Sequence, residues 1–326
     1  MRVLVTGGAG YVGSTSAEQL IEAGHEVVAY DSLELGHRAA VPETAKLIVG
    51  DLADLDLLSR TLTDEHIEAV LHCAGRSLVG ESVLQPDVYF RANVVGGIGL
   101  LDVMRASGVS RIVFSSSAGV YGAPDQLPID EHQPLQPINP YGETKRTFEA
   151  ALRWYASAFE MSAVSVRYFN AAGATDERGE DHDPEAHLIP NILSAAVSGP
   201  PVKIFGTDYP TPDGTCIRDY VHVKDLADAH IAALVLTSEI KAKHVVCNLG
   251  SGSGYSNLEV LRAAEEVVGH PIPFTLAARR EGDPPVLVAS NERARELLGW
   301  QPRRGSLAEM IGSAWRWRQR HPNGYG

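Results

Sequence analysis

The sequence predicts an α/β protein with a doubly wound parallel sheet and a smaller, mixed α/β carboxyl-terminal domain. Short apolar runs rich in β-branched residues alternate with longer segments of helical period, which is the order of a parallel sheet with crossover helices. These runs are apolar throughout, as expected for strands buried on both faces. After "RYFNAAGA" (167–174) the sequence changes to loops rich in Asp, Gly and Pro. The change predicts a second, more irregular domain.

The apolar runs of the first half define the expected strands, and the amphipathic segments between them define the first helices. The six predicted strands are 2–7, 25–31, 46–51, 69–75, 111–117 and 162–170. The helical patterns between them cover 13–23, 53–64 and 93–107. A further helix follows "NPYGETK" (139–145).

The second half contains helical stretches between its polar loops. These predicted helices cover 187–198, 222–237, 256–268, 291–298 and 305–319. We expect a first domain of residues 1–171 and a second of residues 172–326, with a segment near 216–240 that returns to pack on the first.

Composition restricts the function classes. The 326 residues are 44% hydrophobic and 21% charged, with a net charge of −13. This acidity argues against nucleic acid as a partner, so a phosphate-bearing ligand must be held by local arginines and backbone amides. Cys73, Cys216 and Cys247 are too few and too widely spaced for a zinc site or a disulfide framework. No apolar run is long enough to span a membrane, and Met1 leads directly into a strand, so we expect a cytoplasmic protein without membrane contact.

A glycine-rich loop follows the first predicted strand. "VLVTGGAGYVGS" places Gly7, Gly10 and Gly13 between that strand and the next helix. Glycines allow a tight turn and the close approach of a pyrophosphate, and the helix amino terminus supplies amides for it. Asp31 ends the second strand, where a carboxylate binds the adenosine ribose hydroxyls and repels a 2′-phosphate, which favours NAD over NADP. Asp51, after the third strand, is a second candidate for this site or a helix cap.

A serine, a tyrosine and a lysine form the candidate catalytic group. Ser117 ends the fifth strand, where ligands of doubly wound sheets bind, and Tyr141 and Lys145 share one face of the helix that follows. A Tyr loses its proton near pH 10, so activation at pH 7 needs about 4 kcal/mol of differential stabilisation. An ammonium together with an oxidised nicotinamide can supply this. The pattern predicts Tyr141 as base, Lys145 as its activator and nicotinamide-ribose ligand, and Ser117 as a substrate ligand.

The chain resembles the extended short-chain dehydrogenase/reductases, and among them the UDP-glucose (UDP-galactose) 4-epimerases, nearly from end to end. The segments that carry the resemblance are "VLVTGGAGYVGS", "HCAGRSLVGESV", "FSSSAGVYG", "NPYGETK", "RYFNAAGA", "IFGTDYPTPDGTCIRDYVHVKDLADAH", "CNLGSG", "RREGDP" and "WRWRQRHPNGYG". The resemblance implies a Rossmann domain with tightly bound NAD, which is transiently reduced and regenerated. The implied reaction is reversible 4-epimerisation of UDP-galactose and UDP-glucose through a 4-keto intermediate.

The resemblance also implies further ligand contacts. Those to NAD are Tyr11, Val12, Ser32, Leu52, Cys73, Ala74, Gly75, Asn93, Ser115 and Tyr168. Those to the UDP-sugar are Asn170, His187, Leu188, Phe205, Arg218, Tyr220, Arg280, Asp283 and Leu287. Among these, Arg218 and Arg280 would neutralise the diphosphate, Phe205 would lie beside uracil and Asp283 near the uridine ribose.

Neighbouring activities are open to test. Sugar 4,6-dehydratases resemble this chain but carry an Asp–Glu pair after the catalytic serine or threonine, where this chain has Ala118 and Gly119. Elimination therefore has no evident acid and base. The alternatives are a 4-epimerase of UDP-N-acetylhexosamine or UDP-uronate, a net NAD-dependent dehydrogenase, and a silent nucleotide-binding protein. Against the last stands the intact group of Ser117, Tyr141 and Lys145.

Two positions depart from the family pattern. Ser77, with Arg76 beside it, stands where the family can have a lysine that reaches the cofactor phosphate. Leu287 stands at the position that gates the sugar pocket, where aromatic residues go with exclusion of N-acetyl sugars and small residues with their acceptance. Leu is intermediate, and we expect UDP-glucose and UDP-galactose as the main substrates.

Two remaining features bear on metals and partners. "EDHDPEAH" (180–187) offers Asp181, His182, Asp183 and His187, but the implied chemistry needs no metal and we expect none. The helix after "NPYGETK" has two apolar stripes, Phe148, Leu152, Tyr155 and Phe159 on one and Ala151, Trp154 and Ala158 on the other. With helix 93–107 this suggests a homodimer through a four-helix bundle, although the chain's own loops could cover the second stripe.

Overall fold

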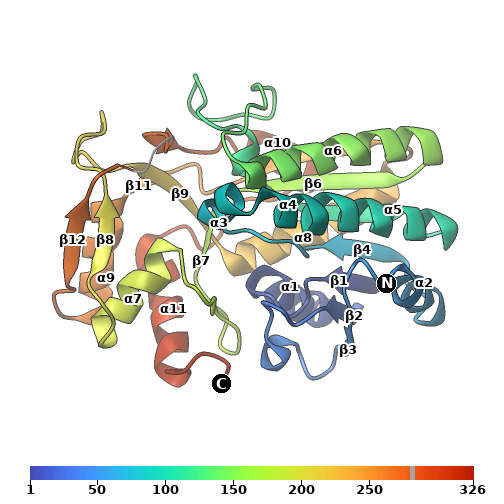
Figure 1. Cartoon of the computed structure of the whole chain (residues 1–326), viewed down its shortest axis with the longest axis horizontal. Helices are drawn as coiled ribbons and strands as arrows, with labels where there is room; N and C mark the ends of the chain where they lie inside the picture. The colour runs from blue at the N-terminus through green and yellow to red at the C-terminus, as the bar shows by residue number, and fades with distance from the viewer. Residues whose placement is uncertain (280–282) are drawn as a thin grey trace.

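The structure is a computed structural model that describes residues 1–279 and 283–326. Its larger part is a seven-stranded parallel sheet in the order β10-β6-β5-β4-β1-β2-β3 (Figure 1). The strands are β1 (Arg2–Thr6), β2 (Glu26–Asp31), β3 (Lys46–Val49), β4 (Ala69–His72), β5 (Arg111–Ser117), β6 (Ser162–Tyr168) and β10 (His244–Leu249). The order reverses between β1 and β4, the place where doubly wound sheets bind nucleotides. The predicted fold class is confirmed.

Helices cover both faces of this sheet. On one face lie α1 (Tyr11–Glu22), α8 (Val223–Glu239) and α10 (Glu292–Leu298). On the other lie α2 (Leu55–Asp64), α5 (Gly96–Ala106) and α6 (Pro140–Phe159). Side chains of β1 alternate between the two cores, since Val3 and Val5 belong to the cluster with α1 and α8, and Leu4 to the cluster with α2 and α5.

The smaller part lies beyond the carboxyl ends of the central strands, to the left in Figure 1. In it β9 (Ile217–His222) pairs with β7 (Asn170–Ala172), β11 (Gly254–Ser256) and β13 (Val286–Leu287), and β8 (Val202–Phe205) pairs with β12 (Phe274–Ala277). The helices α7 (Leu188–Val197), α9 (Asn257–Val268) and α11 (Leu307–Arg320) share a third apolar core.

Short helical turns complete the chain. They are η1 (Arg38–Ala40), α3 (Val79–Leu84), α4 (Pro86–Tyr89), η2 (Phe90–Val95) and η3 (Ala118–Val120). The expected helix 93–107 thus starts earlier, as a π-helical turn, and becomes regular at Gly96. None of the described helices is long and apolar enough to cross a membrane.

The central sheet contains a strand from the second half of the chain that was not predicted from the sequence. Strand β10 pairs in parallel with β6, from His244 opposite Ala163 to Leu249 opposite Tyr168. It lies outside both the segment 1–171 and the returning segment near 216–240. The domain bounds at 171 and 172 stay a prediction.

Candidate active site

The glycine loop closes tightly over the end of β1. Gly7 has a φ of +70°, and a Cβ there would lie 2.6 Å from the Ala74 amide nitrogen. A Cβ on Gly13 would overlap the carbonyl oxygen of Gly7. Both positions therefore require glycine. The loop presents the amino terminus of α1, which starts after Gly10, toward the carboxyl edge of the sheet.

The first residues of α1 connect this loop to the second half of the chain. The hydroxyl of Tyr11 donates to the carbonyl of Gly173, 2.6 Å away. Burial raises the pKa of Tyr11 well above its ordinary value, so this hydroxyl keeps its proton. Val12, next to it, is half-buried.

Asp31 is a buried carboxylate at the end of β2. Its Oδ2 accepts from the Ala9 amide at 3.0 Å and its Oδ1 from the Leu33 amide at 2.8 Å. Each carboxylate oxygen has about two acceptor directions, so one remains on each for a ribose hydroxyl. Ser32 is exposed and accepts from the Glu34 amide. The position agrees with the predicted role of Asp31.

The residues after β3 divide into an exposed acid and a buried apolar residue. Asp51 is exposed and accepts from the Ala53 amide at 2.7 Å. The cap of α2 is Asp54, which accepts from Leu57, so Asp51 does not cap the helix. Leu52 is buried in the core beneath it.

The end of β4 is held by one asparagine. Gly75 has a φ of +152°, and a Cβ there would lie 2.9 Å from Oδ1 of Asn93. Asn93 accepts from the Arg76 amide at 2.8 Å and donates to the Arg76 carbonyl and the Thr144 hydroxyl, both at 3.0 Å. Asn93 thereby fixes the chain after β4 against α6.

Two of the residues predicted to contact NAD meet where β4 and β5 end. The sulfur of Cys73 lies 3.1 Å from the hydroxyl of Ser115. Burial raises the pKa of the Cys73 thiol to about 11, so it is an unreactive group. The same Ser115 hydroxyl lies 2.9 Å from Nε2 of the buried His230 on α8.

Lys145 is a buried cation at the centre of this edge. Its ammonium donates to the Ser115 carbonyl at 2.9 Å and lies 4.8 Å from the centroid of the Phe114 ring. Burial lowers the pKa of Lys145 to about 8. Because an ammonium has three N–H groups, Lys145 can donate further to a bound ribose.

Tyr141 lies one turn before Lys145, on the first turn of α6. Asn139 starts this helix by accepting from the Gly142 amide at 2.9 Å. Burial raises the pKa of Tyr141, and a hydrogen bond with Ser117 partly offsets this. The Ser117 hydroxyl also accepts from the Gly119 amide at 3.1 Å. Ser117, Tyr141 and Lys145 are therefore grouped at the end of β5.

The direction of the Tyr141 shift differs from the expected lowering. The phenol is 8% exposed, and loss of hydration disfavours the phenolate. The Lys145 nitrogen lies 5.8 Å from the centroid of the Tyr141 ring and donates to the Ser115 carbonyl. The protein alone therefore holds Tyr141 protonated. Tyr168, half-buried at the end of β6, has a pKa raised well above the ordinary value by burial.

A buried ion pair beneath these groups was missed by sequence reasoning. Arg167 donates to Glu149 from Nε and Nη2, at 2.9 and 2.5 Å, and both side chains are about 95% buried. Glu149 also accepts from the Ser116 hydroxyl at 2.6 Å. The signal was present, since Glu149 lies four residues after Lys145 on the same face of α6.

Strand β9 and its neighbours bring together several of the residues predicted to bind the UDP-sugar. Asn170 in β7 pairs with Tyr220 and donates to the Asp219 carbonyl at 2.9 Å. Arg218 forms an ion pair with Asp283 and lies opposite Leu287 of β13. Tyr220 is buried, and this raises its pKa.

The other predicted substrate residues lie on different elements. Phe205 ends β8 and is half-buried. Leu287 packs against the apolar cluster that contains Ala118, the residue after Ser117. Arg280 lies outside the described residues. Arg76 forms ion pairs with Glu34 and Glu81. The cation beside Ser77 is therefore already paired with two carboxylates.

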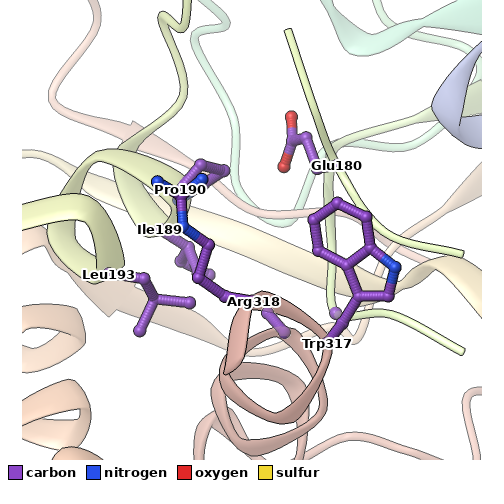
Figure 2. A pocket seen from close by; sticks show the side chains of 8 residues that line it. Glu180, Ile189, Pro190, Leu193, Trp317 and Arg318 are labelled. Atoms are coloured by element: carbon purple, nitrogen blue, oxygen red, sulfur yellow. The ribbon is translucent and has the colours of Figure 1, made fainter. Parts of the chain in front are cut away.

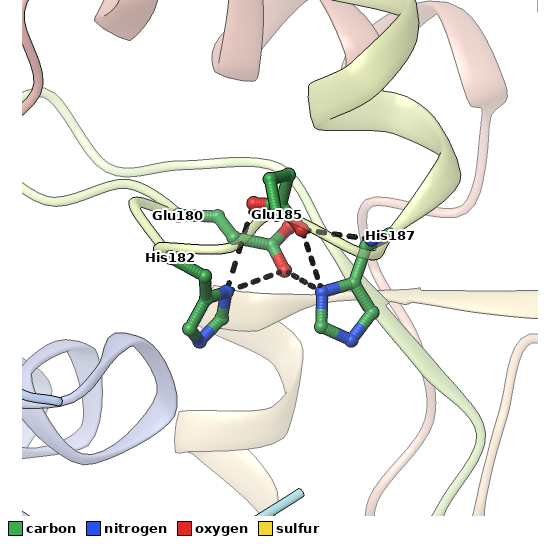
Figure 3. A group of neighbouring side chains, drawn as sticks. All are labelled: Glu180, His182, Glu185 and His187. Atoms are coloured by element: carbon green, nitrogen blue, oxygen red, sulfur yellow. Dashed lines mark hydrogen bonds and ion pairs between the residues drawn. The ribbon is translucent and has the colours of Figure 1, made fainter. Parts of the chain in front are cut away.

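His187 joins a group that we call the His–Glu cluster (Figure 3). Its members are Glu180, His182, Glu185 and His187, whose ligand atoms all lie within 4.8 Å of one another. Asp181 is turned away and accepts from the Tyr325 amide at 2.9 Å. The group of Asp181, His182, Asp183 and His187 considered from the sequence is thus not the one that converges. Leu188, next in the chain, starts α7.

A small cavity lies between this cluster, α7 and α11 (Figure 2). The residues that line it are Gly173, Glu180, Ile189, Pro190, Leu193, Ala314, Trp317 and Arg318. Its walls are mostly apolar, and it lies away from Tyr141 and Lys145.

The described edge of the sheet fits a dinucleotide. The glycines leave room for a pyrophosphate at the start of α1, Asp31 retains acceptor capacity for a ribose, and Lys145 retains N–H groups. Lys145, Tyr141 and Ser117 lie together on the same edge, at the end of β5.

Known proteins share both sequence and fold with this chain. A family model described as the NAD-dependent epimerase/dehydratase family matches residues 3–250. The UDP-glucose 4-epimerase of Lactobacillus helveticus is 50% identical over 328 residues, which cover 100% of this chain and 99% of the relative. The fold is similar to crystal structures of UDP-glucose 4-epimerases from Brucella ovis with NAD and from Bifidobacterium longum with NAD⁺ and UDP. The first has a TM-score of 0.93 and 43% identity over 96% of this chain and 97% of that one. The second has a TM-score of 0.93 and 38% identity over 99% and 100%.

Proposed function

This chain belongs to the NAD-dependent epimerase/dehydratase family, and from this premise we propose that it interconverts UDP-glucose and UDP-galactose by inversion at C4. The observation that carries the proposal is the group of Ser117, Tyr141 and Lys145 at the end of β5, in a chain half identical to a UDP-glucose 4-epimerase. The small Ala118 and Gly119 that follow leave elimination without an acid–base pair.

NAD is the cofactor. Bound NAD⁺ would supply the acceptor for the C4 hydride of the sugar, and the resulting NADH would be the donor that returns this hydride to the opposite face of the 4-keto sugar. The amino terminus of α1 and the bare glycine loop support a pyrophosphate site at the end of β1. Asp31 holds the adenosine ribose, and Lys145 donates to the ribose at the reacting end.

Tyr141 takes the proton of the 4-hydroxyl and later gives it back. Its hydrogen bond with Ser117 orients the phenol, and Ser117 then holds the substrate oxygen. Because burial keeps Tyr141 protonated in the protein alone, the positive nicotinamide has to act together with Lys145 to favour the phenolate.

The UDP moiety is anchored on β9 and its neighbours, which leaves the sugar free to turn. Arg218 supplies positive charge to the diphosphate, with Asp283 beside it to orient the guanidinium and contact the uridine ribose. Tyr220 lies on β9 itself, and Asn170 lies opposite it on β7. Phe205, Leu188, His187 and Arg280 complete this proposed set.

The reaction is tested with purified protein, UDP-galactose and no added NAD. We expect catalytic formation of UDP-glucose without net accumulation of NADH, because the cofactor is regenerated within each turnover. A net stoichiometric reduction of NAD would instead identify a dehydrogenase. Binding of UDP-galactose without conversion would identify a nucleotide-binding protein.

Leu287 sets the sugar specificity in this proposal. Its side chain packs on the cluster that contains Ala118, so its volume limits the space beside the catalytic serine. We expect UDP-glucose and UDP-galactose as main substrates, and a rise in kcat/KM for UDP-N-acetylglucosamine in Leu287→Ser. An unchanged ratio between the two substrates would show that another residue is the gate.

A cytoplasmic homodimer is the proposed assembly. Trp154 and Phe159 on α6 and Val95 before α5 are 66%, 43% and 64% exposed, and they leave an apolar surface on this helix pair. A second copy would cover it in a four-helix bundle. Light scattering at micromolar protein is expected to give twice the chain mass, and Trp154→Glu is expected to give the monomer.

A further inference from the structure

The proposed reaction gives the His–Glu cluster no chemical role, although one member, His187, also belongs to the proposed UDP-binding set. The cluster lies in the loop between β7 and α7, away from the group of Ser117, Tyr141 and Lys145. Two imidazoles and two carboxylates from one loop turn inward to a common point (Figure 3). Nitrogen and oxygen donors in equal number suit a divalent transition metal such as zinc.

The donor atoms lie within 4.8 Å of one another, and their closest separations fall on both sides of that of a tetrahedral site. Oε1 of Glu180 lies 3.3 Å from Nδ1 of His182 and 2.7 Å from Nδ1 of His187. The Glu185 oxygens lie 3.0 Å from Nδ1 of His187 and 3.7 Å from Nδ1 of His182. A tetrahedral ion with ligands at about 2.0–2.1 Å requires donor separations of about 3.3 Å. Small side-chain movements bring all four atoms to that separation.

The donors differ in exposure and are only partly satisfied. The Glu180 and Glu185 side chains are 9% and 19% exposed, and those of His182 and His187 are 25% and 42% exposed. Nδ1 of His182 is fully buried, and among the described residues it makes no hydrogen bond, although two carboxylates are close. A buried nitrogen without a hydrogen bond is costly unless it binds another ligand. Two carboxylates also balance the charge of one divalent cation.

The chain already orients the donors from outside. Oε1 of Glu185 accepts from the amides of Ala186 and His187 at 2.8 and 2.7 Å. The Glu185 carbonyl accepts from the Asn191 side chain at 3.3 Å, which ties the loop to α7. Such contacts fix ligands before the metal binds.

We propose that the His–Glu cluster binds one divalent transition-metal ion of the zinc class. The ion has a structural role, because it would cross-link residues 180–187 of the loop immediately before α7 starts at Leu188. It touches none of the reacting groups, so the reaction itself still needs no metal. The expectation of no metal rested on that chemistry and on the position of the segment in a polar loop that leads to a helix.

The first test is zinc stoichiometry and coordination in the full chain as purified and dialysed against a chelator. We expect one Zn²⁺ per chain in competition with a chromophoric chelator, and no competition by Mg²⁺, which prefers oxygen ligands. X-ray absorption at the zinc edge should show four nitrogen or oxygen ligands at about 2.0 Å. Sulfur scattering, or no binding at micromolar zinc, would overturn the proposal. If no zinc binds, the cluster is held together only by hydrogen bonds and ion pairs between its histidines and its carboxylates.

The second test uses matched histidine variants. His182→Gln should lower zinc affinity at least 10-fold, as is typical for a site that loses one ligand or its support. His132→Gln removes an exposed histidine and should keep wild-type affinity. If His182→Gln retains wild-type affinity, the assignment is wrong. If it does not fold, Glu185→Gln replaces it, and the zinc absorption spectrum of the wild type decides.

Discussion

The ammonium nitrogen of Lys145 lies 5.8 Å from the centroid of the Tyr141 ring. The cation therefore stands beside the phenol, while its hydrogen bond goes to the Ser115 carbonyl. Burial outweighs this proximity, and the pKa of Tyr141 is raised in the protein alone. Tyr141 is therefore expected to lose its proton, and to act as a base, only when a second positive charge, that of oxidised nicotinamide, is present.

Removal of the Tyr141 hydroxyl should abolish most of the activity. Proton transfer by a positioned side chain contributes roughly 10²–10⁴-fold to a rate, so Tyr141→Phe should lower kcat by about 10³-fold. Conversion of UDP-galactose, measured by separation of the two nucleotide sugars, gives the rate. NAD content and far-UV circular dichroism should stay at wild-type values. Wild-type turnover in this variant would show that Tyr141 is not the base.

A methyl group on the glycine loop should expel the cofactor. In Gly13→Ala the new Cβ overlaps the Gly7 carbonyl oxygen. Overpacking of this kind costs about 1–3 kcal/mol, which corresponds to roughly 5–150-fold in affinity for NAD. NAD released by denaturation of the purified protein measures the loss. Gly80→Ala is the matched control, because no described atom lies within 4 Å of its Cβ. Equal NAD content in both variants would disprove the role of the loop.

Buried histidines should make the protein sensitive to acid. Burial lowers the pKa of His230 to about 4 and that of His72 to about 3. The unfolded chain binds these protons near pH 6.5 and the folded protein does not, so stability is complete above pH 6.5 and is lost as the pH falls toward 4. From pH 7 to 5, His230 should account for about 2 kcal/mol of this loss.

Urea unfolding at the two pH values checks this contribution. In His230→Gln the loss of unfolding free energy between pH 7 and 5 should be smaller than in the wild type. His132→Gln, at an exposed position, should behave as the wild type does. The same loss in all three proteins would mean that His230 is protonated in the folded state.

Continuous apolar runs made the six strands from β1 to β6 predictable from the sequence. Strand β10 was missed because "HVVCNL" (244–249) follows a helix of the second half, and sequence alone does not show that it pairs with β6. The strands β7, β11 and β13 have two or three residues, too few for a periodic signal.

The residues of the catalytic group were predictable from the sequence, but the electrostatics of the site were not. Spacing along one helix placed Tyr141 and Lys145 together. The direction of the Tyr141 pKa was not predictable, because it depends on burial and on where the lysine donates its hydrogen bond. The members of the His–Glu cluster were not predictable either, since the backbone turns Glu180 and Glu185 inward and Asp181 toward Tyr325.

Isotope retention tests most directly the claim that the hydride removed from C4 returns to C4. UDP-galactose carrying deuterium at C4 is converted by the purified protein in ordinary water, and the product is examined by NMR and mass spectrometry. The account predicts UDP-glucose with all of its deuterium at C4, because the hydride never exchanges with solvent. Loss of deuterium to water, or its appearance at another carbon, would contradict it.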